Sequence, residues 1–157
     1  MGYDIVRMDE NGKQVKITDL NDENYFRWNV FGMRRTRDLA AWGIGAMTNE
    51  EIGRSVGKSA DTKMGSFDNV KEAMGDMLAQ IREAFRTPKY SEDVPWGNAF
   101  VHNGDEVSGE ACSQFADALQ AAIDKIFSSP VRPDIDLDYT VQFIEYLRNS
   151  PNGVYVG

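Results

Sequence analysis

Four arginines and a group of aromatic residues lie side by side in residues 25–42, which read YFRWNVFGMRRTRDLAAW. Guanidinium groups bind carboxylates and phosphates through paired N–H donors, and they also stack on aromatic rings. The chain as a whole is acidic, with 25 Asp and Glu residues against 17 Lys and Arg. The arginine cluster is therefore the first candidate for a site that binds an anion.

Read as one helix, this stretch gathers its apolar residues on one side. The four that share an arc are Trp28, Phe31, Leu39 and Trp42. Arg35 lies in the middle of that arc, Arg27 and Arg34 lie beside it, and Arg37 lies further round. Arg35 is thus expected to extend its charge to water, to pair with a buried carboxylate, or to line a pocket. In the pocket interpretation the ligand-binding residues are Tyr25, Arg27, Trp28, Arg34 and Arg35.

Two other segments nearly match known ligand-binding loops. Residues 53–59, GRSVGKS, resemble a phosphate-binding loop but have three residues between the glycines instead of four. Residues 134–145 resemble the start of a calcium loop, but Tyr139 stands where the turn needs glycine. We expect neither ligand, and we interpret the aspartates at 134, 136 and 138 as residues favoured at a helix N-terminus.

The chain has one histidine, His102, and one cysteine, Cys112. His102 precedes Asp105 and Glu106, so a histidine–carboxylate pair is conceivable. Cys112 belongs to an apolar helical stripe, which favours an inert core thiol over a nucleophile. One histidine and one cysteine do not supply a usual zinc ligand set. The sequence therefore predicts no catalytic constellation, no metal site and no cofactor.

A loop before the short segment 99–102 carries Trp96 and Tyr90, which are candidates for exposed aromatics. Loops often carry binding residues. We therefore expect Trp96 and His102 to contribute to a surface for a protein partner, with the alternative that Trp96 covers the core.

The bulk properties of the chain exclude several functional classes. A net charge of −8 and a pI of about 4.6 argue against nonspecific binding of nucleic acid, which gains most of its energy from cations on phosphates. No apolar run approaches the roughly 18 residues of a membrane span, and the first residues do not resemble a signal peptide. One cysteine fits a reducing compartment. The expected location is the cytoplasm.

Hydrophobic periodicity and capping residues predict five helices and a few short strands. The helices are expected at 29–42 with Asn29 as cap, 48–56, 68–86, 108–127, and from a cap at Asp136 or Asp138 to 148. The strands are expected at 3–8 and 13–20, joined by Asn11-Gly12 as a hairpin, at 99–102 and at 154–156.

The predicted fold class is α+β in a single domain spanning 1–157. A small, mostly antiparallel sheet is built from the N-terminal hairpin and the later strands, and four to five helices pack on it. The terminal strand can pair with the first hairpin. In 68–86 six residues follow the helical period: Val70, Met74, Met77, Leu78, Ile81 and Phe85. In the last helix four residues are expected to face inward: Leu137, Val141, Ile144 and Leu147.

Four segments carry a resemblance to other proteins. They are Gly2-Tyr3-Asp4, residues 25–29 with Gly32-Met33, residues 107–119, and residues 143–148 with Gly153 and the strand after it. Together they resemble a loose group of small uncharacterised proteins from actinobacteria and their phages. The resemblance implies a phage or prophage setting and carries no activity.

Three functional interpretations follow. The first is a non-enzymatic, acidic, cytosolic binding protein, encoded by a phage as an accessory protein, that engages a host protein. The second is a small-molecule or nucleotide-binding protein whose anion pocket uses Arg27, Arg34 and Arg35 on a phosphorylated ligand. The third is a small hydrolase or transferase that uses His102.

Overall fold

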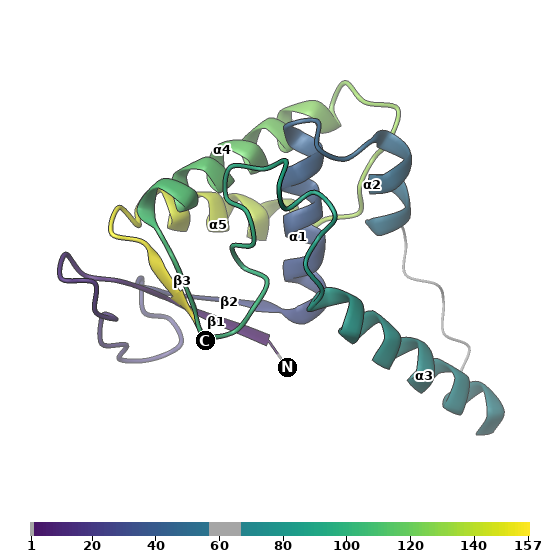
Figure 1. Cartoon of the computed structure of the whole chain (residues 1–157), viewed down its shortest axis with the longest axis horizontal. Helices are drawn as coiled ribbons and strands as arrows, with labels where there is room; N and C mark the ends of the chain where they lie inside the picture. Colours follow the sequence, from purple (N-terminus) through teal and green to yellow (C-terminus); the bar gives the residue numbers. More distant parts are fainter. Residues whose placement is uncertain (1, 57–66) are drawn as a thin grey trace.

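The computed structural model describes residues 2–56 and 67–157 (Figure 1). In chain order the elements are β1 (Gly2–Arg7), β2 (Tyr25–Asn29), α1 (Val30–Gly43), α2 (Asn49–Ser55), α3 (Phe67–Ala84), β3 (Asp105–Val107), α4 (Gly109–Ile126), α5 (Leu137–Arg148) and β4 (Val154–Val156). Helices and a small antiparallel sheet are thus combined in an α+β fold, which confirms the predicted class.

The strands of the described residues form a sheet in the order β2-β1-β4-β3, and every neighbouring pair is antiparallel. In β1, Tyr3 and Ile5 are buried whereas Asp4 between them is exposed, as expected for a strand with one face on the core. Ile5 lies opposite Val156, so the end of the chain pairs with its beginning. This confirms the predicted pairing of the terminal strand.

The partner of β1 in the N-terminal hairpin differs from the prediction. Residues 13–20 form no strand, and only Met8 and Gln14 bridge across the turn in which Gly12 has a φ of 74°. Instead β2 pairs with β1, with Trp28 opposite Tyr3. The aromatic residues of 25–28 cover the core from an extended strand, and the helix begins only after Asn29. A turn signal is local, whereas the choice of strand partner depends on what the sheet must bury.

Helix α1 begins at Val30 because the Asn29 side chain accepts a hydrogen bond of 2.6 Å from the Gly32 N–H. The helix packs along α4, and α4 packs along α5 (Figure 1). At the end of α1 the two backbones meet: a Cβ on Gly43 would lie 2.3 Å from the Ala118 carbonyl oxygen. Only glycine permits this approach, which fixes α1 against α4.

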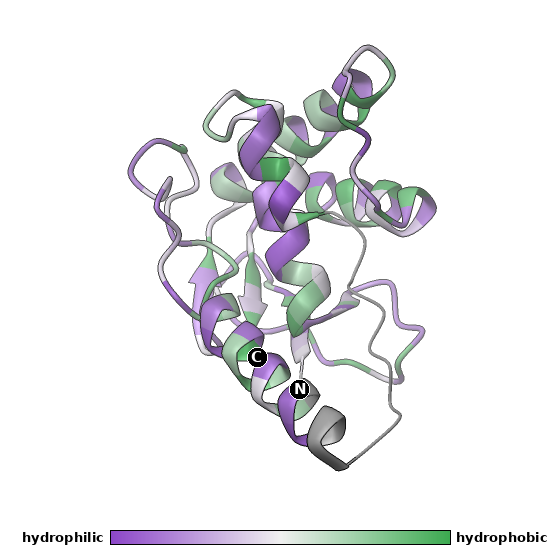
Figure 2. Cartoon of the chain, turned by 90° about the vertical axis from the view of Figure 1, so that its right-hand side faces the viewer, coloured by the Kyte–Doolittle hydropathy of each residue, from purple (hydrophilic) through white to green (hydrophobic). Residues whose placement is uncertain are grey.

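Helix α3 extends away from the sheet and from the other helices (Figure 1). Its periodic apolar residues Met74, Met77 and Leu78 are 61%, 55% and 55% exposed, and Figure 2 shows apolar and polar residues alternating along this helix. Among the residues of α3 whose burial the structure describes, only Ala84 at its C-terminal end is fully buried. Helical periodicity therefore identified the helix correctly, but it does not tell what covers the apolar face.

The predicted strand at 99–102 is also wrong. These residues form turns, and Phe100 has a φ of 64°, while the strand β3 begins at Asp105. In α5, Ile144 and Leu147 face the core as predicted, but Leu137 and Val141 are 40% and 45% exposed. The buried side of α5 is formed by Thr140, Phe143, Ile144, Tyr146 and Leu147, so only the second half of the expected stripe lies on it.

Among the residues that the structure describes, no helix is both long enough and apolar enough to cross a membrane.

Candidate functional site

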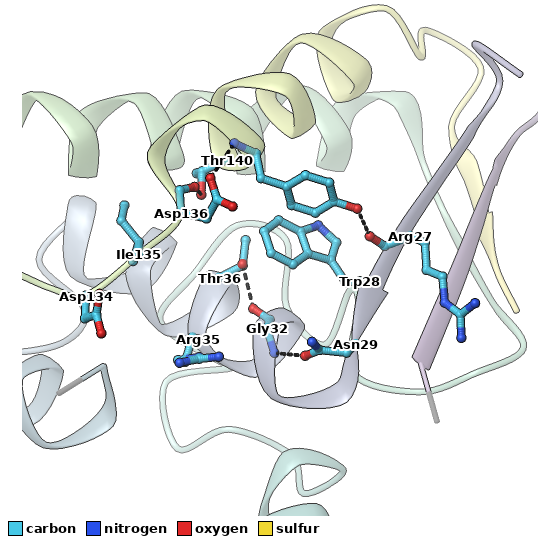
Figure 3. Close-up of a pocket in the computed structure, with 11 residues that line it drawn as sticks. Arg27, Trp28, Asn29, Gly32, Arg35, Thr36, Asp134, Ile135, Asp136 and Thr140 are labelled. Carbon is cyan, nitrogen blue, oxygen red and sulfur yellow. Dashed lines mark hydrogen bonds between the residues drawn. The ribbon is translucent and has the colours of Figure 1, made fainter. Parts of the chain in front are cut away.

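A cleft of about 800 Å³ lies between the β2–α1 junction and the beginning of α5 (Figure 3). We call it the tryptophan cleft. Its lining residues are Arg27, Trp28, Asn29, Gly32, Arg35, Thr36, Asp134, Ile135, Asp136, Tyr139 and Thr140. Its size lies within the range of about 300–1,000 Å³ that is typical of small-molecule sites.

Trp28 forms the centre of this cleft (Figure 3). The indole lies against the first turn of α1, where a Cβ on Gly32 would be 2.9 Å from Trp28 Cε3. Glycine at this position therefore lets the ring approach the helix. On its other side the ring meets Tyr139 edge to face, with centroids 4.7 Å apart at 80°. Trp28 is 8% exposed, and its Nε1 has no hydrogen-bond partner among the described residues.

Tyr139 joins the two sides of the cleft. Its hydroxyl donates a hydrogen bond to the Arg27 carbonyl oxygen, which links α5 to the outer strand β2. Burial, more than any other influence, raises the pKa of Tyr139, so the hydroxyl keeps its proton and stays a donor. This bond fixes the width of the cleft at the Trp28 end.

The side of the cleft opposite α1 is built by the start of α5. Asp136 caps the helix by accepting a hydrogen bond of 3.0 Å from the Tyr139 N–H. The Thr140 hydroxyl donates to the Asp136 carbonyl at 2.7 Å, and the Asp134 N–H donates to the Val56 carbonyl at 3.1 Å. These bonds hold the two aspartates in place across from α1.

The tryptophan cleft carries charges of both signs. Arg35 supplies a positive charge, and Asp134 and Asp136 supply two negative ones. Arg27 also lines the cleft, but its guanidinium points away from Trp28 (Figure 3). Within the described residues no arginine nitrogen lies within 4.0 Å of a carboxylate across the cleft, and Arg27 pairs only with Asp4 outside it, at 3.8 Å. Arg27 and Asp134 lie at opposite ends in Figure 3, with Trp28 between them. The cleft therefore offers separated charges of both signs around an apolar centre.

The structure brings together only part of the predicted ligand site. Arg27, Trp28 and Arg35 line the tryptophan cleft, but Arg34 lines a different cleft. Tyr25 lines neither, because it sits at the far end of β2 and its hydroxyl donates to the Asp4 carboxylate. The three arginines predicted for one anion pocket are thus divided.

The buried arginine of α1 is Arg37 and not Arg35. Arg37 is 2% exposed, whereas Arg35 is only partly buried at the cleft. The predicted apolar side of the helix included Trp28, but Trp28 belongs to strand β2. The helix begins at Val30, directly after Asn29. In this helix Arg37 lies on the side that faces the end of α3 and residues 85–104.

Of the two residues predicted for a partner surface, one is buried and one is exposed. Trp96 is 5% exposed and packs edge to face on Phe115 at 5.1 Å, so it covers the core, as the alternative held. His102 is exposed, with its Nδ1 3.6 Å from an Asp105 carboxylate oxygen. Burial raises the pKa of the Cys112 thiol to about 12, which fits an inert core residue. The described residues hold no group of three or more metal-ligating side chains.

Sequence reasoning missed the α5 side of the cleft. The sequence predicts Asp136 as a helix cap, but nothing in the pattern places it opposite Trp28, more than a hundred residues away in the chain. The pattern gives Tyr139 no role beyond excluding a calcium loop. The sequence does contain one signal for the cleft, namely the two predicted helix N-termini at Asn29 and Asp136. Helix N-termini are frequent binding sites for ligands, because their first backbone N–H groups are free.

Comparison with protein-family models, with curated proteins and with solved structures finds no match to this chain. The resemblance to actinobacterial and phage proteins stays a prediction, and so does the host protein expected as a partner. The function is therefore argued from the clefts themselves.

Proposed function

We propose that the chain is a non-enzymatic binding protein that holds a small zwitterionic molecule, such as an amino acid or a dipeptide, in the tryptophan cleft. The observation that carries this proposal is the charge pattern of the cleft. The Arg35 guanidinium and the carboxylates of Asp134 and Asp136 line the cleft beside the buried Trp28 indole, and no ion pair joins them.

The hydroxyl groups of the cleft support binding rather than catalysis. Thr36 donates to the Gly32 carbonyl and Thr140 to the Asp136 carbonyl, each at 2.7 Å, while Tyr139 donates to the Arg27 carbonyl. Each hydroxyl proton is thus directed to the backbone and not to a base that activates a nucleophile. His102, the residue of the enzymatic interpretation, is not among the residues that line this cleft.

The charge pattern selects the ligand class. An anion alone meets Arg35 but also the repulsion of Asp134 and Asp136. A cation alone is attracted by Asp134 and Asp136 but repelled by Arg35. A molecule with one acidic and one basic group satisfies both sides, and an apolar side chain between the two groups can contact Trp28 and Ile135.

A melting-temperature screen with free amino acids and dipeptides tests the proposal, because a ligand that binds only the native state raises the apparent stability. We expect at least one probe to raise Tm at millimolar concentration. Arg35→Gln and Asp134→Asn should each weaken that probe about tenfold or more, because each leaves a charge of the bound ligand unpaired.

Arg34→Gln is the matched control, since Arg34 is the next residue of the same helix but lines the other cleft. Its affinity for the probe should equal that of the unmodified chain. The proposal fails if no probe raises Tm, or if Arg34→Gln and Arg35→Gln weaken binding equally.

A further inference from the structure

We propose that a second cleft, on the other side of α1, binds a phosphate monoester. This cleft of about 450 Å³ lies among α1, α2 and the segment after α3, and we call it the arginine cleft. Five cationic side chains line it: Arg34, Arg37, Arg54, Arg86 and Lys89. This concentration of positive charge stands out in a chain with a net charge of −8.

The three carboxylates that line the same cleft are already engaged. Glu83 forms an ion pair with Arg86 at 3.2 Å. Glu51 accepts a hydrogen bond of 3.0 Å from the Thr48 N–H in the capping box of α2. Asp38 accepts hydrogen bonds from the hydroxyls of Tyr90 and Ser55. Each of these carboxylates therefore has a partner other than the remaining cations.

Arg34 and Lys89 form no ion pair with any carboxylate that the structure describes. Arg54 pairs with Glu50 at 3.3 Å, but both side chains are more than 70% exposed, and such pairs hold their partners weakly. Three cations at the cleft are thus able to turn to a ligand without breaking a strong contact.

Arg37 adds a fixed positive charge at the base of the arginine cleft. It is 98% buried, since its exposed fraction is 2%. Its two terminal nitrogens donate to the Phe100 and Ala84 carbonyls, but its Nε is buried and has no partner among the described residues. Buried donors are nearly always paired, so the unpaired N–H of Arg37 is unusual for a buried guanidinium.

Asp38 does not cancel this preference for an anion. Burial, followed by the neighbouring Asp38 carboxylate, raises the pKa of Tyr90 far above its usual range, so the Tyr90 hydroxyl stays protonated as a donor. Ser55 and Tyr90 donate to the two oxygens of the Asp38 carboxylate, which keeps its charge, but the five cations that line the cleft outnumber its three carboxylates.

The number and type of cations favour a phosphate group. Guanidinium groups bind phosphate oxygens through two parallel hydrogen bonds, and Lys adds a compact charge. A phosphate monoester brings close to two negative charges and three acceptor oxygens at neutral pH. The cleft is larger than one phosphate group, which leaves room for the organic part of the ester.

Isothermal titration with inorganic phosphate and with glycerol 3-phosphate, a monoester without an amino group, tests this inference at an ionic strength kept constant with sodium chloride. We expect millimolar or tighter binding of phosphate and a gain in affinity for the ester. Arg34→Gln should weaken both about tenfold, and Lys89→Gln should weaken both several-fold, because each removes a charge-assisted contact.

Arg35→Gln is the control, because Arg35 lines the tryptophan cleft and not this one. It should bind phosphate as the unmodified chain does. The inference is overturned if titration with sodium chloride or sodium sulfate releases the same binding heat as phosphate. It is also overturned if Arg34→Gln and Arg35→Gln lose the same amount of phosphate affinity. Arg35 tests the tryptophan cleft and Arg34 tests the arginine cleft, so a negative result at one cleft does not affect the proposal for the other.

Discussion

The guanidinium group of Arg37 donates a hydrogen bond of 2.5 Å to the carbonyl oxygen of Phe100, 63 residues further along the chain. Phe100 has a φ of 64°, and no other non-glycine residue among those described has a positive φ. The second terminal nitrogen of Arg37 donates to the Ala84 carbonyl at 2.6 Å, where α3 ends. One buried side chain thus ties α1 to the end of α3 and to the segment that follows.

Arg37→Met should lower the free energy of unfolding by about 2–4 kcal/mol, because two buried carbonyl groups lose their donor. Urea denaturation followed by far-UV circular dichroism measures the change. Arg35→Met, at a partly exposed position of the same helix, should cost less than about 1 kcal/mol. Equal losses in the two variants would show that the Phe100 and Ala84 contacts contribute nothing.

Two helical glycines should respond to alanine in opposite directions. Gly43→Ala places a Cβ 2.3 Å from the Ala118 carbonyl oxygen, so we expect a loss of about 1–3 kcal/mol. Gly53→Ala in α2 meets only Val131 Cγ1 at 3.9 Å, so the better helix propensity of alanine should add about 0.5–1 kcal/mol. Thermal unfolding of both variants checks the prediction, which fails if Gly43→Ala is as stable as the unmodified chain.

Tyr90→Phe should destabilise the chain by about 1.5–3 kcal/mol, since it removes a hydrogen bond of 2.5 Å to the buried Asp38 carboxylate. Tyr155→Phe is the control, because the Tyr155 hydroxyl bonds to no other residue that the structure describes. Its loss should stay within about 0.5 kcal/mol. Chemical denaturation at pH 7 compares the two variants, and similar midpoints would contradict the role given to Asp38.

Cys112 makes stability depend on alkaline pH. Burial raises the pKa of its thiol from 9.0 to about 12, so the folded chain binds this proton more tightly than the unfolded chain does. The stability that this provides is complete below about pH 9 and is lost as the pH rises toward about 12. The buried Tyr90 and Tyr146, whose pKa values are also raised by burial, act in the same direction.

The Cys112→Ala variant isolates the contribution of the thiol to the pH dependence of stability, because it removes this titrating group and leaves both tyrosines. Between pH 9 and pH 11, the variant should lose stability less steeply than the unmodified chain. Urea midpoints at several pH values provide the slopes. Identical slopes would mean that the thiol is no more buried in the folded chain than in the unfolded one.

The sequence predicted the local features of the fold well. Asn29, Thr48, Ser108 and Asp136 all cap helices as expected, because a cap needs only its own side chain and the next three residues. The end strand at 154–156 was also found, since alternating apolar residues after a glycine turn are a local pattern.

Features that depend on distant partners were not predictable in this way. The pattern of 13–20 resembles that of β2, and only the three-dimensional sheet decides that β1 pairs with β2. Met77 follows the helical period as well as any core residue, yet it faces solvent. In the same way Arg27, Trp28 and Arg35 were recognised as site residues, while the facing aspartates belong to a segment that the fold alone brings near.

The two clefts share α1, and this constrains how related chains can vary. Arg34 and Arg35 are consecutive, so their side chains leave the helix about 100° apart and reach different clefts. One residue inserted or deleted between Asn29 and Arg34 rotates everything after it by the same angle. Both arginines would then leave their clefts together, so related sequences that keep either site must align through this turn without a gap.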